Sequence, residues 1–159
     1  MIVIAVVLFM VLALGEDIVG GFLARRQHRA VVTGATTAVG KTIAKYNQIL
    51  IQAYKQDKPS LLMPVATERQ ITDVRLYMTY QEIEKKRKLI NVLKDLRIDK
   101  TKTGKTKATA WTNETWEYYY IDMQTRKEFG RTTESYKVTY QLIKMYDAWQ
   151  VDRLTAKKI

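Results

Sequence analysis

The 159-residue chain is long enough for one ordinary domain and an appendage, because domains usually hold about 100–150 residues. It has 27 Lys and Arg against 16 Asp and Glu, a formal net charge of +11, and this excess attracts anionic lipid head groups, nucleic acid or an acidic protein. It contains no cysteine, which excludes disulfide scaffolds, thiol catalysis and cysteine-based metal sites.

The first 24 residues are the most distinctive segment of the sequence. Residues 1–15 are apolar, Glu16 and Asp17 follow, and the run IVGGFLA continues to Ala24. A helix over residues 1–15 is about 22 Å long, too short for a hydrocarbon core of about 30 Å, whereas residues 1–24 reach about 36 Å. We expect residues 1–24 to be a transmembrane anchor in which Glu16 and Asp17 contact a partner subunit or lie near the membrane interface.

Two alternatives remain open for this segment. It could be the apolar region of a signal peptide, although no basic residues precede it, or a buried helix of a soluble domain. The basic cluster Arg25, Arg26, His28 and Arg29 follows it, and the positive-inside rule then favours a cytoplasmic domain. We interpret residues 25–37 as a juxtamembrane connector. His28 is the only histidine, so it fits this flank better than a metal site, which needs several converging ligands.

The stretch VVTGATTAVGKTIA, residues 31–44, fits a relaxed Walker A pattern and also the glycine-rich turn of short-chain dehydrogenases. Both kinds of loop belong to parallel sheets built from repeated strand–helix–strand units, and no such units follow in this chain. We therefore expect the start of a helix, with Thr36 or Thr37 as its N-cap and with Gly40 and Lys41 inside it. No cofactor and no metal are expected.

Apolar residues spaced by three and four predict a helix from Thr36 to about Asp57, which Pro59 ends. A short helical turn is expected at residues 61–63, and residues 67–76 form either a helix or a lid.

The second half of the chain favours strands. The charged residues 82–91 predict a helix or a loop, and residues 92–98 a strand. Aromatic and alternating segments predict strands over 107–123, 135–146 and 149–154, with a loop at 126–131. Helices followed by antiparallel strands indicate an α+β domain, with the helices packed on one face of a curved antiparallel sheet.

The segments ATAWTNETWEYYYIDM and TTESYKVTYQLIKMYDAWQVDRL resemble the closing strands of the NTF2-like (nuclear transport factor 2-like, or cystatin-like) superfamily. Among its membrane-anchored members, the chain is similar to the intermembrane-space domains of plastid division proteins and to VirB8-like subunits of type IV secretion systems. The resemblance covers about residues 38–155 and implies an NTF2-like domain over 38–159. It also implies an extracytoplasmic domain, against the basic flank, and we follow it.

Aromatic residues of the predicted strands are the first group of candidate site residues. They would pair across strands and fill the core, or line the pocket that the concave sheet face often forms in this superfamily. The candidates for the pocket or a partner surface are Trp111, Trp116, Tyr118, Tyr120, Tyr136, Tyr140 and Trp149, with Tyr119 beside them. Enzymes of the superfamily place a carboxylate in that pocket, and the available acids are Asp73, Glu114 and Asp122.

Two basic runs are the second group. Their simplest interpretation is solvated surface, and their alternatives are contact with a nucleic-acid backbone or with anionic lipid. The residues are Lys85, Lys86, Arg87 and Lys88 in the first run, and Lys102, Lys105 and Lys107 in the second.

Together these features predict a single-pass membrane protein whose basic domain is a non-catalytic interaction or assembly subunit of a larger cell-envelope complex. Its expected partners are other subunits of that complex, with anionic lipid head groups or a small molecule in the sheet pocket as further candidates. Two alternatives stay open: a small NTF2-like enzyme or ligand-binding protein, and a basic nucleic-acid-binding protein, nucleic acid being the less favoured partner.

Overall fold

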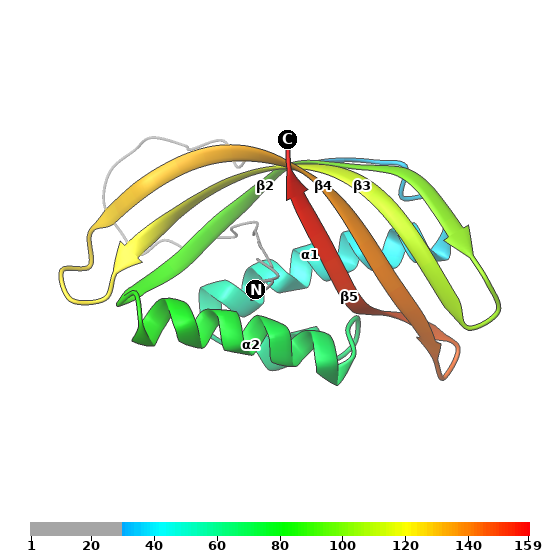
Figure 1. Cartoon of the computed structure of the whole chain (residues 1–159), viewed down its shortest axis with the longest axis horizontal. Coiled ribbons are helices and arrows are strands. Elements are labelled where there is room, and N and C mark those ends of the chain that lie inside the picture. The colour runs from blue at the N-terminus through cyan, green and yellow to red at the C-terminus, as the bar shows by residue number, and fades with distance from the viewer. Residues whose placement is uncertain (1–29) are drawn as a thin grey trace, which may run out of the picture.

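A computed structural model of the chain describes residues 30–159, in which a curved sheet arches over two helices (Figure 1). The elements in chain order are β1 (Val31–Thr33), α1 (Ala38–Gln56), the 3-10 helix η1 (Pro59–Leu62), α2 (Glu68–Ile83), β2 (Arg87–Thr103), β3 (Lys107–Asp122), β4 (Glu128–Met145) and β5 (Ala148–Lys158).

The predicted anchor, residues 1–24 with Glu16 and Asp17, lies outside the described residues, as does the basic cluster that contains His28. Within residues 30–159, no helix has the length and apolar character needed to cross a membrane.

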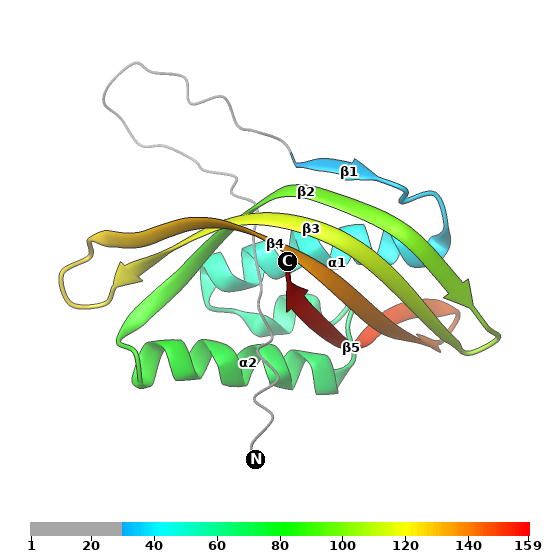
Figure 2. The same ribbon diagram turned by 45° about the horizontal axis from the view of Figure 1, so that its top comes forward.

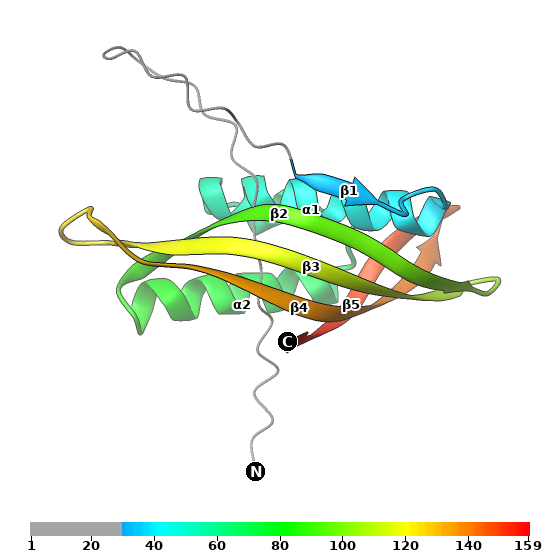
Figure 3. The same cartoon turned by 90° about the horizontal axis from the view of Figure 1, so that it is seen from above.

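The sheet has five strands in the order β1-β2-β3-β4-β5. Strands β2 to β5 form an antiparallel meander, whereas β1 pairs parallel to β2 with Val31 opposite Asp95. Both helices pack against the concave face of the sheet, as the views from two sides show (Figures 2 and 3). The α+β architecture predicted from the sequence is therefore confirmed, with the addition of a parallel edge strand.

Helix α1 begins as the sequence predicts. The Thr37 side chain accepts a hydrogen bond from the Gly40 backbone N–H at 3.0 Å, so Thr37 is the N-cap. Gly40 and Lys41 lie in the first helical turns, and Asp57 closes the helix in the left-handed conformation with φ of 52°. The Walker-like stretch is thus a strand, a turn and the start of a helix.

The conformation of Gly34 explains why this position of the stretch is a glycine. Its φ is +78°, and a Cβ atom at this position would lie 2.4 Å from the Ile98 carbonyl oxygen. The glycine therefore lets the turn after β1 pass close to the backbone of β2.

Three segments differ from the prediction. Helix α2 extends to Ile83, beyond the predicted 67–76. Strand β2 already begins at Arg87, and β4 at Glu128, where a charged helix or loop and a loop were expected. These strand ends form the long β2–β3 and β3–β4 pairings, in which Arg87 lies opposite Asp122. Their outer ends carry charged residues, so the alternation that marks a half-buried strand is missing there.

Register shifts in every antiparallel pair explain the curvature of the sheet. They lie between Leu93 and Asp95, Ile98 and Lys100, Tyr118 and Tyr120, and Gln141 and Leu142. Because a bulge adds a residue to one strand and bends it, four bulges wrap the sheet around the helices. The core lies between the two layers, with Leu50 and Ile43 of α1 facing Leu93 and Leu142 of the sheet.

Candidate functional site

The concave side of the sheet, where the predicted pocket would lie, is filled by side chains around Glu114. This carboxylate is 4% exposed. Its Oε1 accepts hydrogen bonds from Thr112 Oγ1 and from the Tyr140 hydroxyl, each at 2.7 Å, and its Oε2 accepts one from Trp116 Nε1 at 2.9 Å. Burial raises the pKa of the Glu114 carboxyl, and the three hydrogen bonds oppose that rise.

The helices complete this polar network. Asn47 Nδ2 of α1 donates to the Tyr140 hydroxyl at 3.1 Å, and Gln70 Nε2 of α2 donates to the Tyr46 hydroxyl at 2.8 Å. The rings of Tyr46 and Tyr140 meet edge to face with centroids 6.2 Å apart. The network therefore ties both helices to the middle of the sheet, and Glu114 serves as a hydrogen-bond acceptor inside it.

The three candidate acids occupy different places. Glu114 is enclosed, whereas Asp122 lies in the β3–β4 turn, where its carboxylate accepts from the backbone N–H groups of Gln124 and Thr125. These turn hydrogen bonds lower the pKa of Asp122. Asp73 lies on α2. Burial raises the pKa of Tyr46, and the negative charges of Glu114 and Asp73 raise it further.

An acid or base must reach its substrate within hydrogen-bond distance. The enclosed Glu114 has no such access, and no group of three acids or histidines within residues 30–159 could hold a metal ion.

The aromatic candidates fall into three groups. Trp116, Tyr136 and Tyr140 are buried in the core. Tyr118, Tyr120 and Trp149 are half-buried and pack against that core. Trp111 is 37% exposed, and the Lys100 ammonium lies 5.6 Å from its ring centroid.

One end of the sheet combines basic and aromatic residues. We name it the basic–aromatic end: the α2–β2 turn, the β3–β4 turn and the residues flanking them, 83–88 and 120–129. The Met123 backbone N–H donates to the Lys86 carbonyl oxygen at 3.0 Å, so the two turns are adjacent. The Arg87 guanidinium lies 3.7 Å from the Tyr120 ring centroid, and that ring lies 5.7 Å from the Phe129 ring.

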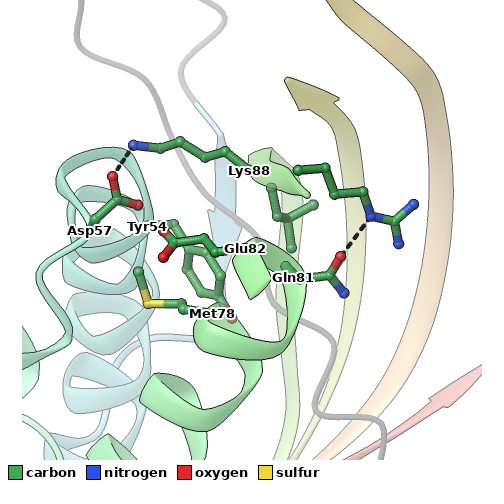
Figure 4. Close-up of a pocket in the computed structure, with 8 residues that line it drawn as sticks. Tyr54, Asp57, Met78, Gln81, Glu82 and Lys88 are labelled. Atoms are coloured by element: carbon green, nitrogen blue, oxygen red, sulfur yellow. Dashed lines mark hydrogen bonds and ion pairs between the residues drawn. The ribbon is translucent and has the colours of Figure 1, made fainter. Parts of the chain in front are cut away.

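The structure divides the first basic run into two pairs. Arg87 Nε donates to Gln81 Oε1 at 2.7 Å, and Lys88 Nζ lies 2.5 Å from Asp57 Oδ2 and donates to the Lys55 carbonyl oxygen at 2.9 Å (Figure 4). The Arg87 and Lys88 side chains therefore make contacts within the domain, to α2 and to the end of α1. Lys85 and Lys86 are exposed, with the Lys85 ammonium 5.4 Å from the Tyr80 ring centroid.

The second basic run lies at the opposite end of β2, around the β2–β3 turn. Lys102, Lys105 and Lys107 are all exposed there, among threonines and Gly104. Because β2 spans Arg87–Thr103, the two runs are separated by the length of the sheet and do not form one continuous patch.

A surface hollow of about 320 Å³ was not predicted from the sequence. It lies between the first turns of α1, the segment at Pro64 and the β4–β5 turn, and Lys41, Lys45 and Trp149 are among its lining residues. The spacing of Lys41 and Lys45 places them on one helix face, but only the tertiary fold brings Trp149 beside them.

The sequence has no matching family model and no match among curated proteins. Solved structures do match. The intermembrane space region of the chloroplast protein ARC6 is 13% identical with a TM-score of 0.65, and the alignment covers 76% of this chain and 95% of that chain. A periplasmic fragment of TraM is 5% identical with a TM-score of 0.53, covering 77% and 96%.

An NTF2-like superfamily protein from Salmonella enterica serovar Typhimurium is 9% identical with a TM-score of 0.48, covering 74% of this chain and 89% of that chain. The curved meander over two helices agrees with the matches to the ARC6 region and the TraM fragment, whose TM-scores exceed 0.5. Residues 30–159 therefore have the NTF2-like, cystatin-like fold that the closing strands predicted.

Proposed function

We propose that this chain is a non-catalytic docking subunit of a larger cell-envelope complex, held at the membrane by residues 1–24. The observation that carries the proposal is the burial of Glu114. Among the three candidate acids, Glu114 is the one in the core, where it is 4% exposed and is bound by three side-chain donors. The proposal therefore assigns the activity of the domain to its outer surfaces.

The similar structures support this proposal and suggest a side of the membrane. Those with the two highest TM-scores above are, by their names, an intermembrane space region and a periplasmic fragment. Both names describe parts of larger proteins, one in an intermembrane space and one in the periplasm. By analogy, we propose that residues 30–159 are extracytoplasmic.

The nucleic-acid alternative has less support. A backbone-binding groove needs a continuous line of positive charge. Here the two basic runs lie at opposite ends of β2, and Arg87 and Lys88 of the first run bind Gln81 and Asp57.

The assembly role is tested on membranes of the native host, solubilised gently and separated on a native gel. We expect the full chain to migrate with a fixed set of other subunits. A chain that stays functional as a monomer in detergent contradicts the proposal. Native mass spectrometry of the same preparation tests the ligand-binding alternative, since a retained small molecule of constant mass would support it.

The side of the membrane is tested with a cysteine in place of the exposed Ser60, because the chain has no cysteine of its own. An impermeant thiol reagent should label Ser60→Cys in intact cells, with the outer membrane permeabilised where there is one. Labelling only after lysis would place the domain in the cytoplasm.

A further inference from the structure

We propose that the basic–aromatic end is the surface on which the domain rests on an anionic lipid bilayer. Lys85, Lys86, Arg126 and Lys127 would contact the lipid head groups, while Ile83 and Phe129 would enter the interface. The inference rests on the proposed membrane attachment, and it adds the face of the domain that meets the bilayer.

Three large apolar side chains lie exposed at the basic–aromatic end. Ile83 is 57% exposed, Phe129 43% and Met123 39%, and all three belong to this one end of the sheet. Large apolar side chains that lie exposed beside basic residues are typical of surfaces that bind the membrane interface. The β2–β3 turn at the other end is also basic, but its own residues are threonines and Gly104. The exposed apolar residues nearest to it, Met145 and Tyr146, lie at the neighbouring β4–β5 turn.

The basic–aromatic end has more basic than acidic residues. Glu84, Asp122 and Glu128 are the acids of residues 83–88 and 122–128. The Asp122 carboxylate accepts from two backbone N–H groups of its own turn, and Glu128 lies 2.9 Å from Arg131. Lys85, Lys86, Arg126 and Lys127 are all exposed. The surface is therefore positive, which complements phospholipids with net negative head groups.

Shape favours a bilayer over a peptide as the partner. The β3–β4 turn projects beyond the two helices (Figure 1), so Met123 and Phe129 flank the tip of a protruding hairpin. Peptides bind in grooves and pockets, whereas a protruding tip with apolar residues can enter the head-group region of a membrane.

The test uses the full chain with a single cysteine, either Gln124→Cys beside the hairpin tip or Thr106→Cys in the β2–β3 turn, labelled with an environment-sensitive fluorophore. Each protein is reconstituted in phosphatidylcholine vesicles with or without phosphatidylglycerol, and a spin-labelled lipid serves as quencher. We expect quenching at position 124 in the anionic vesicles, and little quenching at position 106 or in phosphatidylcholine alone. Equal quenching at the two positions would overturn the proposal.

Charge and apolar variants sharpen the test. Lys85→Gln with Lys86→Gln removes two charges and should lower the equilibrium constant for bilayer contact about thirtyfold. Ile83→Ser with Phe129→Ser should also reduce quenching at position 124, even at low salt. The matched control, Lys102→Gln with Lys105→Gln, should leave it unchanged. An effect of the control as large as that of the Lys85 and Lys86 pair would contradict a specific surface.

The outcomes separate this inference from the proposed function. Quenching at position 124 in a chain that forms no complex would support lipid contact and contradict the assembly role. A complex that forms normally while position 124 is not quenched would overturn only the lipid contact. Loss of the complex in the Lys85 and Lys86 variant, without quenching in the wild-type chain, would assign this end to an acidic protein instead.

Discussion

Glu114 is the residue that decides between a catalytic and a structural interior. Its two oxygens accept hydrogen bonds from Thr112, Tyr140 and Trp116 in a site closed by α1 and α2. Replacing a buried acceptor leaves its donors unpaired, at a cost of about 1–3 kcal/mol for each group. Replacing a catalytic acid has the opposite effect on stability, because such a replacement often stabilises the fold.

We predict that Glu114→Gln lowers the free energy of unfolding by about 1–3 kcal/mol, because the new amide N–H₂ would face one of the three donors. The loss of unfolding free energy caused by Glu114→Gln should be larger at low pH. Since burial raises the pKa of Glu114, the folded state holds its proton more tightly than the unfolded state. The stability from this group is fully present below the unfolded pKa and is lost as pH rises from that pKa through the higher folded pKa.

Denaturant unfolding of the two proteins from pH 4 to pH 8 measures this difference. As a control, Glu84→Gln changes an exposed acid and should shift the stability by less than about 0.5 kcal/mol. A Glu114→Gln protein that is more stable than the wild type would indicate a functional carboxylate.

Asn91 gives a second prediction at this scale. It is fully buried on β2, and within residues 30–159 neither its amide nitrogen nor its oxygen has a hydrogen-bond partner. Because an unpaired buried polar group costs about 1–3 kcal/mol, Asn91→Val should stabilise the domain by about that amount. A rise in the midpoint of thermal unfolding confirms it, and a fall would indicate that Asn91 binds a group of its own, such as a buried water.

At the scale of elements, the Walker-like stretch packs a turn against β2 and starts a helix. Gly34 has φ of +78° and no room for a Cβ atom, whereas Lys41 is exposed on α1. We predict that Gly34→Ala lowers the free energy of unfolding by about 2 kcal/mol or more, and that Lys41→Ala changes it by less than about 0.5 kcal/mol. The contrary pattern, a stable fold whose function requires Lys41, would revive the phosphate-binding interpretation.

The first basic run gives a matched pair at this scale. Arg87 binds Gln81 and covers the Tyr120 ring, whereas Lys86 is exposed in the turn before it. We therefore expect Arg87→Ala to cost about 1–2 kcal/mol of stability and Lys86→Ala less than about 0.5 kcal/mol. Chemical unfolding of the two variants tests the split, and equal costs would show that the run acts as one solvated surface.

The strands show which parts of the sheet can be predicted from the sequence. Alternation at Tyr136, Val138, Tyr140 and Leu142 correctly predicts β4, since all four are buried on one face. The same alternation places Thr112, Glu114 and Trp116 on one face, which is the signal for the buried network. It fails at the ends of β2 and β4, where the sheet extends beyond the helices and charged residues continue the pairing.

Contacts between distant segments could not be predicted in this way. The parallel pairing of β1 with β2, the ties of Arg87 to Gln81 and of Lys88 to Asp57, and the hollow beside Trp149 all depend on the tertiary fold. The sequence alone does not distinguish the roles of the four basic residues at 85–88, because these roles depend on their neighbours in the folded domain.

At the scale of the whole molecule, the fold separates its parts by role. The interior is a closed core with a polar network, and one end combines exposed apolar and basic residues. The opposite end has the basic β2–β3 turn and the exposed Tyr146 of the β4–β5 turn, and the hollow of about 320 Å³ lies beside Lys41 and Trp149. Such a molecule fits a subunit that binds through its surface while its interior only maintains the fold.

We propose that the interior of the domain is structural and that its function depends on assembly. The most direct measurement replaces the chain in its native host with the Glu114→Gln variant, and compares the amount of assembled complex on a native gel with the function of the cells. We predict that the two fall together, in proportion to the folded protein. A complex present at the wild-type amount, in cells that have lost the function, would show that Glu114 does chemistry and would contradict the claim.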